Sequence, residues 1–174
     1  GALYLRARTP FAPLLRGGGQ ESGRRSGTQN VRGAVGFAAA AQAATAQVED
    51  DAASMMALRD RLYRGLRAYE RIQPTVEVEP GSLDYLPNIV SVMVEGLESE
   101  TMVLRFDGLG IGVSGGSACS SHSLEPSHVL RAMGIAADQA HGALRISFGH
   151  GTTAADIDGF LAAVPKVLDW KRSR

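Results

Sequence analysis

The stretch GALRISFGHGTTAADID, residues 142–158, joins two structural patterns. Residues 143–149 alternate between apolar and polar side chains, as a strand with one buried face does. Thr153 and Asp156 have the spacing of a capping box ahead of a helical apolar stripe at Ile157, Phe160, Leu161, Val164 and Leu168. The stretch therefore predicts a strand followed by the helix that closes the chain. Pro165 predicts a kink or an early end of that helix, because proline lacks an amide hydrogen and clashes with the preceding turn.

Strand and helix patterns also alternate upstream of this stretch. Residues 75–78 and 88–94 predict strands, and residues 99–106 have helical spacing. Residues 111–114 predict a short strand, and residues 125–134 predict a helix with Pro126 in its first turn and Gly134 as its stop. The interleaving of both types predicts the α/β class.

The first third of the chain predicts a strand, a loop and a long helix. Residues 1–6 have a strand pattern, and residues 10–28 are rich in glycine, proline and arginine. From Val31 onward the chain is rich in alanine, and apolar residues recur at steps of three and four at Val48, Ala52, Met55, Leu58, Leu62, Leu66 and Tyr69. This stripe predicts a helix long enough to link two domains.

Composition excludes several classes of function. The 174 residues are 44% hydrophobic and 21% charged, with 18 basic and 18 acidic residues, so no net field favours nucleic acid or a membrane surface. No apolar run approaches the roughly 20 residues that span a bilayer. A single cysteine and the lack of a leader pattern favour a reducing cytoplasm. We expect small molecules and other proteins as partners.

The single cysteine, Cys119, lies in the stretch SGGSACSSHSLEPSHVLRAMG, residues 114–134. A free cysteine is most often a small buried apolar residue. The glycine and serine residues around Cys119 offer no apolar packing, so we expect an exposed, mobile loop between a strand and a helix. A thiol in that setting is a candidate nucleophile.

Two other patterns near Cys119 are weak. Gly110, Gly112 and Gly115 match G-x-G-x-x-G, but a dinucleotide fingerprint follows a strand and opens a helix, and here a helix precedes. Cys119 with His122 and His128 supplies too few nitrogen and sulfur ligands for a structural zinc site.

Three separated motifs resemble one enzyme family. The Cys119 stretch is similar to the active-cysteine segment of the NifS/IscS-type cysteine desulfurases, which are pyridoxal-phosphate enzymes of the class V aminotransferase superfamily. Residues 17–37 resemble the glycine and RSGT segment of that family, and residues 142–158 resemble its arginine strand and last helix. The resemblance implies the small C-terminal domain of a fold-type I enzyme, residues 46–174. It also implies that residues 1–45 are the last strand of the large domain and the start of the linking helix.

The resemblance implies a chemistry and a set of site residues. Pyridoxal phosphate would be the cofactor and L-cysteine the substrate, and Cys119 would take the sulfur as a persulfide and pass it to an acceptor or scaffold protein, such as those of iron–sulfur cluster assembly. Arg145 would bind the substrate carboxylate, and Thr28 would reach the cofactor phosphate of the opposite subunit in a homodimer. From the residues alone, a surface arginine and an ordinary turn threonine remain alternatives.

One departure from the family pattern concerns lysine. The lysine that binds the cofactor covalently precedes the GALY segment in the family, whereas these residues contain only Lys166 and Lys171. We therefore expect the C-terminal part of a desulfurase, inactive without a lysine-bearing part. The alternatives are a non-enzymatic sulfur-relay or metal-ligating thiol module, and another class V enzyme such as a selenocysteine lyase.

Overall fold

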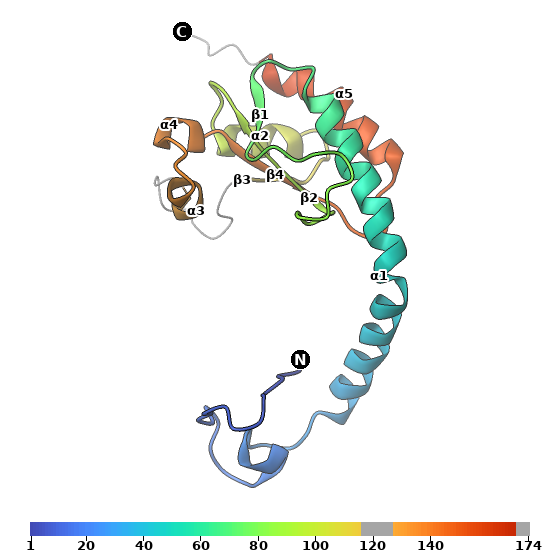
Figure 1. The fold of residues 1–174 in the computed structure, drawn as a ribbon, viewed down its shortest axis with the longest axis vertical. Coiled ribbons are helices and arrows are strands. Elements are labelled where there is room, and N and C mark those ends of the chain that lie inside the picture. Colours follow the sequence, from blue (N-terminus) through green and yellow to red (C-terminus); the bar gives the residue numbers. More distant parts are fainter. Residues whose placement is uncertain (116–126, 170–174) are drawn as a thin grey trace. The chain divides into compact units, whose positions relative to one another are not determined.

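The computed structural model describes residues 1–115 and 127–169, which form two compact units, Gly1–Glu49 and Asp50–Arg174 (Figure 1). The long helix α1 contributes residues to both units. Its bounds and those of the other elements are η1 Gln20–Gly23, α1 Val31–Leu66, β1 Ile72–Pro74, β2 Ile89–Val94, α2 Ser99–Asp107, β3 Ser114–Gly115, α3 His128–Ala132, α4 Ala137–Ala140, β4 Ala143–Ser147 and α5 Ala154–Leu168.

The second unit is built on an antiparallel sheet of four strands in the order β1-β2-β4-β3. Strand β4 pairs with β2 from Ala143 opposite Met93 to Ser147 opposite Ile89, and its other edge pairs with β3. Because successive side chains point to opposite faces, Val90, Val92, Leu144 and Ile146 share one apolar face.

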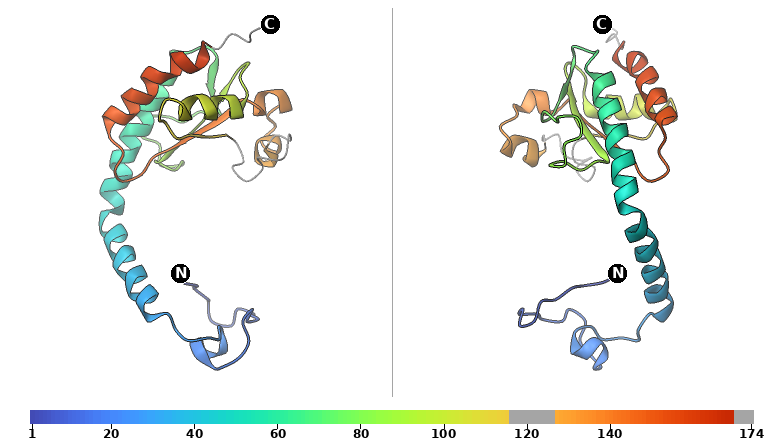
Figure 2. Two further views of the ribbon diagram at one scale, coloured as in Figure 1. Left: turned by 180° about the vertical axis from the view of Figure 1, so that it is seen from behind. Right: turned by 45° about the vertical axis from the view of Figure 1, so that its right-hand side comes forward.

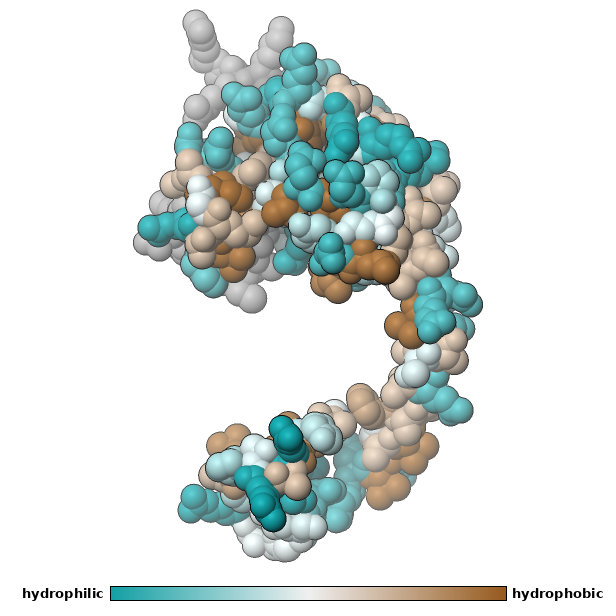
Figure 3. All heavy atoms as spheres, viewed as in Figure 1, coloured by the Kyte–Doolittle hydropathy of each residue, from teal (hydrophilic) through white to brown (hydrophobic). Residues whose placement is uncertain are grey.

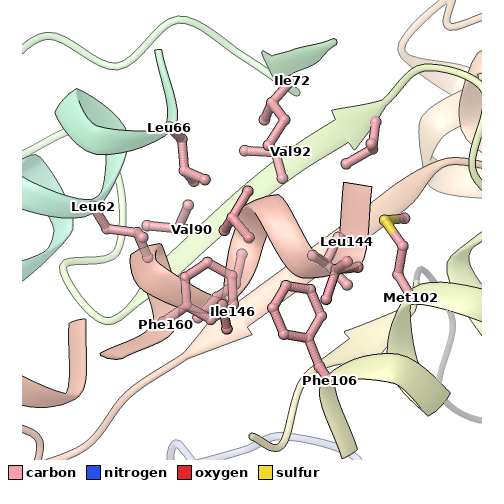
Figure 4. Packing of buried hydrophobic residues seen from close by; sticks show 14 of the residues in the cluster. Leu62, Leu66, Ile72, Val90, Val92, Met102, Phe106, Leu144, Ile146 and Phe160 are labelled. Carbon is pink, nitrogen blue, oxygen red and sulfur yellow. The ribbon is translucent and has the colours of Figure 1, made fainter. Parts of the chain in front are cut away.

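The end of α1, together with α2 and α5, packs on that apolar face (Figure 2). The helices contribute Leu62, Leu66, Met102, Phe106 and Phe160 to one core with the strands, as Figure 4 shows. The rings of Phe106 and Phe160 stack with centroids 4.8 Å apart and planes 13° apart. The core therefore holds helices from three parts of the chain against one side of the sheet.

Arginine side chains join elements that are distant in sequence. Arg61 on α1 donates two 2.7 Å hydrogen bonds to Asp158 on α5. Arg71 donates to the carbonyl oxygen of Leu168 at 3.2 Å, and Arg105 donates to that of Lys166 at 3.1 Å. The last carbonyl groups of α5 have no partner within their own helix, so these guanidinium groups stabilise its end.

One arginine is fully buried. Arg59 on α1 contacts Asp60 at 3.0 Å and donates to the carbonyl oxygens of Ser82 at 3.0 Å and Tyr85 at 3.4 Å. The Asp60 carboxylate also accepts a 2.7 Å hydrogen bond from the amide of Gly81. These bonds attach the segment between β1 and β2 to α1.

Most of the predicted elements of the second unit are confirmed. Strands β2 and β4 and helices α2 and α5 lie at the predicted residues, and Thr153 and Asp156 form the predicted capping box. Gly134 has a φ of +84° beyond α3, as expected for a stop, whereas Pro126 lies outside the described residues.

Three predicted strands differ from the structure. No strand forms over residues 1–6, because the described residues of the first unit offer no strand to pair with. The strand predicted at 75–78 lies at 72–74 instead, because Val76 and Val78 pack against the core without entering the ladder. Of residues 111–114 only Ser114 is in β3, since the amide of Ile111 bonds to Phe106 at the end of α2.

Of the kink or early end predicted at Pro165, the early end is wrong, because α5 continues to Leu168. Proline removes a single amide donor from the helix, and it is exposed here. The bonds from Arg71 and Arg105 to the following carbonyl groups stabilise the last turn.

Candidate functional site

Arg145, the predicted carboxylate ligand, lies in the middle of β4. Its neighbours Leu144 and Ile146 are buried in the core, so the alternation of the strand places Arg145 on the opposite face of the sheet. The side chain is half-buried and makes no hydrogen bond or ion pair with another described residue. A guanidinium fork in that state suits a carboxylate, which it binds through two parallel hydrogen bonds.

Polar residues flank Arg145 on both neighbouring strands. Ser91 of β2 and Ser114 of β3 are its register partners, so all three residues lie on one face. The hydroxyl of Ser91 lies 2.9 Å from that of Thr75, and the amide of Thr75 donates to the carbonyl oxygen of Ser91 at 3.0 Å. A polar row therefore crosses the sheet through Thr75, Ser91, Arg145 and Ser114.

The predicted nucleophile, Cys119, lies outside the described residues, which stop at Gly115 and resume at Ser127. The expectation of an exposed, mobile loop applies to the same segment and stays a prediction. Gly115 ends β3, the strand that pairs with Arg145 of β4. The chain thus enters the Cys119 segment from a strand residue next to the register partner of Arg145.

The lysine in the described part of the chain is not near Arg145. Lys166 is exposed on α5, and α5 packs on the apolar face of the sheet, opposite the face that carries Arg145. Lys171 lies outside the described residues. Lys166 is therefore not placed to react with a molecule held by Arg145.

Thr28, the predicted phosphate ligand, is exposed in the first unit at the end of a loop that hydrogen bonds to itself. Arg25 donates to the carbonyl oxygens of Gly27 at 3.0 Å and of Thr28 at 3.2 Å, and Ser26 donates to that of Gly18 at 2.9 Å. The Arg24 guanidinium and the Thr28 hydroxyl bond to no other described residue. A hydroxyl and a guanidinium donate hydrogen bonds that phosphate oxygens accept, so these residues fit the phosphate end of pyridoxal phosphate.

Two negative findings concern the described residues alone. Among residues 1–115 and 127–169, no group of three or more histidine, cysteine or acidic residues could hold a metal ion. No helix in those ranges is both long enough and apolar enough to cross a membrane.

The sequence pattern singled out Arg145 but not the polar residues beside it. Strand alternation indicates which face a residue occupies within its own strand, but the pairing register decides which residues lie side by side. Ser91 and Ser114 are 23 residues apart, so no local pattern could relate them to Arg145.

Comparisons with known proteins identify the family of the chain. A family model described as "Aminotransferase class-V" matches residues 1–160. The chain is 45% identical to a cysteine desulfurase of Cereibacter sphaeroides over 99% of its own length and 43% of that protein. It is 43% identical to the cysteine desulfurase NifS of Azotobacter vinelandii over 97% of its own length and 41% of that protein. A solved structure titled "NIFS-LIKE PROTEIN" matches 95% of the chain and 41% of its own length with a TM-score of 0.80 at 36% identity. The chain thus spans well under half the length of these relatives.

Proposed function

Given that the chain belongs to the aminotransferase class V family, we propose that it is the C-terminal part of a cysteine desulfurase. In this proposal the enzyme removes sulfur from L-cysteine, leaves alanine, and passes the sulfur from Cys119 to an acceptor protein. The pairing of β3 with β4 is the observation that supports it. That pairing puts the start of the Cys119 segment beside the strand of Arg145.

Arg145 would bind the carboxylate of L-cysteine. Its guanidinium is half-buried on the polar face and bonds to no other described residue. Arg59 is the contrast, since it is fully buried and its guanidinium is used by Asp60, Ser82 and Tyr85. A guanidinium that bonds to no other described residue, on the strand between Ser91 and Ser114, suits a carboxylate ligand.

Cys119 would be the nucleophile. Its thiolate attacks the sulfur of the bound cysteine, so that the carbon–sulfur bond breaks, a sulfur–sulfur bond forms, and the carbon takes up a proton to give alanine. Pyridoxal phosphate, when bound, supplies an electron sink for the bonds at the α-carbon of the substrate. Cys119 lies four residues beyond Gly115, and four extended residues span at most about 14 Å, so the sulfur starts within reach of Arg145.

The loop that ends at Thr28 would bind the cofactor phosphate in a homodimer. The hydrogen bonds of Arg25 and Ser26 within the loop support this role, because they hold the loop while the Arg24 guanidinium and the Thr28 hydroxyl bond to no other described residue. We assign Arg25 to holding the loop and Thr28, with Arg24, to the phosphate. The assignment to the opposite subunit comes from the family resemblance.

The first unit would belong to a larger domain. None of its residues is buried, and hydrophobic residues, brown in Figure 3, lie exposed on it. Its exposed large apolar side chains are Leu3, Tyr4, Phe11, Leu14, Leu15, Val31, Val35, Phe37 and Val48. Large apolar side chains exposed in such number are typical of a surface that another part of a protein covers. We propose that residues 1–45 are part of the large cofactor-binding domain and that residues 46–174 form the small domain. The catalytic lysine would come from the rest of the longer protein, and the chain alone would be inactive.

The proposal is tested by assaying alanine and sulfide after incubation with pyridoxal phosphate and L-cysteine. The longer protein that contains these residues should release alanine, whereas the 174-residue chain alone should not. Cys119→Ser should abolish sulfur release in the longer protein, and trapping with an alkylating reagent should show a persulfide on Cys119 only in the unsubstituted protein.

Two outcomes would contradict the proposal. Alanine formation by the 174-residue chain alone would disprove the need for a lysine-bearing part. A longer protein that turns over selenocysteine but not cysteine would be a selenocysteine lyase instead.

A further inference from the structure

The connection between β1 and β2 carries three large apolar side chains that are exposed. Leu83, Tyr85 and Leu86 have exposed fractions of 84%, 42% and 64%, and we call these three residues the Leu83 surface. We propose that the Leu83 surface is an interface with the part of the large domain that lies outside these 174 residues. The inference rests on the proposed function, in which the chain is the C-terminal part of a longer enzyme.

The backbone that carries the Leu83 surface is held by α1. The fully buried Arg59 donates to the carbonyl oxygens of Ser82 at 3.0 Å and Tyr85 at 3.4 Å, and the amide of Gly81 donates to the carboxylate of Asp60 at 2.7 Å. A buried guanidinium is costly unless its donors are bonded, so folding of the second unit fixes the position of this backbone. The Leu83 surface is therefore preorganised, which lowers the entropy lost when a partner covers it.

The composition of the connection indicates an apolar partner. Residues 80–88 contain a single charged residue, Asp84. Connections on a protein surface are usually built from small and polar turn residues, whereas this one presents two leucines and a tyrosine to solvent. Large apolar side chains with so little charge among them suit an apolar protein surface and not a nucleic acid or a polar ligand.

The Leu83 surface belongs to the end of the sheet at which α1 enters the second unit. It precedes the start of β2, and the start of β2 pairs with the end of β4. Beyond that pairing the amide of Phe148 donates to the carbonyl oxygen of Asn88 at 3.1 Å. Two residues farther on, Nδ1 of His150 lies 2.7 Å from the carboxylate of Asp51, in the first turn of α1 that belongs to the second unit. The surface is therefore close to the point at which the rest of the longer protein is attached.

This location favours a domain of the same protein over a free partner. A stable interface between separate proteins takes about 20–30 residues on each side, and three side chains supply a small part of that. Two surfaces joined through one chain meet at an effective concentration of about millimolar, so a smaller contact suffices. The chain covers 43% of the Cereibacter sphaeroides relative, so a domain large enough to cover the Leu83 surface lies outside it.

The first test measures alkylation of introduced cysteines in the longer protein. Leu83→Cys is compared with Leu104→Cys, both in a Cys119→Ser background, and labelling of each peptide is followed by mass spectrometry. Leu104 is a matched control, because it is a leucine on the outer face of α2 with an exposed fraction of 72%. Without a cover, position 83 would react at least as fast as position 104. We expect position 83 to react about 10-fold more slowly, or slower still, because alkylation requires a thiolate that solvent reaches.

The second test identifies the partner by photochemical cross-linking. The longer protein with Leu83→p-benzoylphenylalanine is irradiated, separated on a denaturing gel and digested for mass spectrometry. We expect a cross-linked product with the mass of one chain, in which position 83 is joined to a peptide from outside these 174 residues. A product with twice that mass would show that a second copy covers the Leu83 surface, and it would overturn our assignment. Equal alkylation at positions 83 and 104 would show that nothing covers the surface.

Neither measurement depends on enzyme activity, so the results separate the interface from the proposed function. If the longer enzyme forms alanine and needs Cys119, while position 83 reacts as fast as position 104, the function stands and our inference is wrong. If Cys119→Ser retains activity while position 83 is protected and cross-linked within one chain, the proposed role of Cys119 fails and the interface stands.

Discussion

The assignment of Arg145 to the substrate carboxylate leads to a measurable preference between ligands. L-alanine, the proposed product, carries the carboxylate, and ethylamine is the same molecule without it. A guanidinium fork makes two hydrogen bonds to a carboxylate, each worth about 1.5–3 kcal/mol because the groups are charged. The free energies of two neighbouring hydrogen bonds do not add fully, so we take about 3 kcal/mol for the pair. L-alanine should therefore bind roughly 100-fold more tightly than ethylamine.

Arg145→Ala should abolish this preference. The assay is competitive inhibition of the longer enzyme by each ligand, followed through the release of sulfide, because added L-alanine would obscure the formation of alanine. The inhibition constants of both ligands are measured for each variant. The ratio of roughly 100 should fall to near one in Arg145→Ala. It should fall about tenfold in Arg145→Lys, because lysine keeps the charge but not the planar fork. The fold should be unaffected within about 0.5 kcal/mol, since Arg145 bonds to no other described residue.

Arg67→Ala is the matched control. Arg67 is exposed and pairs with Glu77 at 3.0 Å, so its removal takes away an arginine without touching the polar row. This variant should keep the ligand ratio of the unsubstituted enzyme. An Arg145→Ala enzyme that also keeps that ratio would refute the assignment of the carboxylate site.

Three further predictions concern stability and are measured by urea unfolding. Phe160→Ala should lower the unfolding free energy by about 3–5 kcal/mol, because the ring is buried and stacks on Phe106; a loss below about 1 kcal/mol would mean that the stack is not formed. Thr153→Ala should cost about 1 kcal/mol through loss of the helix cap, and Thr153→Ser should restore most of it. The hydrogen bonds from Arg61 lower the pKa of Asp158 below its ordinary value, so the pair stabilises the fold above about pH 4 and this contribution is lost as the pH falls further; Asp158→Asn should remove that part of the acid sensitivity, and equal pH profiles would contradict the prediction.

Local sequence patterns predicted the elements that have a capping signal of their own or a clear separation between an apolar and a polar face. Strand β4 and helix α5 follow from alternation and from the Thr153 cap, which are written within a few residues. Residues 75–78 show where this fails, since alternation reports burial and Val78 is buried without belonging to a strand. The ladder needs a partner strand, which local sequence does not specify.

The residues of the candidate site show the same difference between local features and features that depend on distant parts of the chain. Arg145 could be singled out because its residue type and strand position are both local properties. Its neighbours Ser91 and Ser114 depend on the register of three strands. The continuation of α5 past Pro165 likewise depends on Arg71, which is distant in the chain.

Arg59 has a consequence for cooperativity. If the segment between β1 and β2 detached from the body of the protein by itself, the Arg59 guanidinium, which has no exposed surface in the folded protein, would lose both of its carbonyl partners, Ser82 and Tyr85. That segment therefore opens together with α1 and not as an independent flap. The amide of Gly81, bonded to Asp60, should accordingly exchange its hydrogen with solvent as slowly as amides of the sheet, although it lies in a connection that has no regular secondary structure.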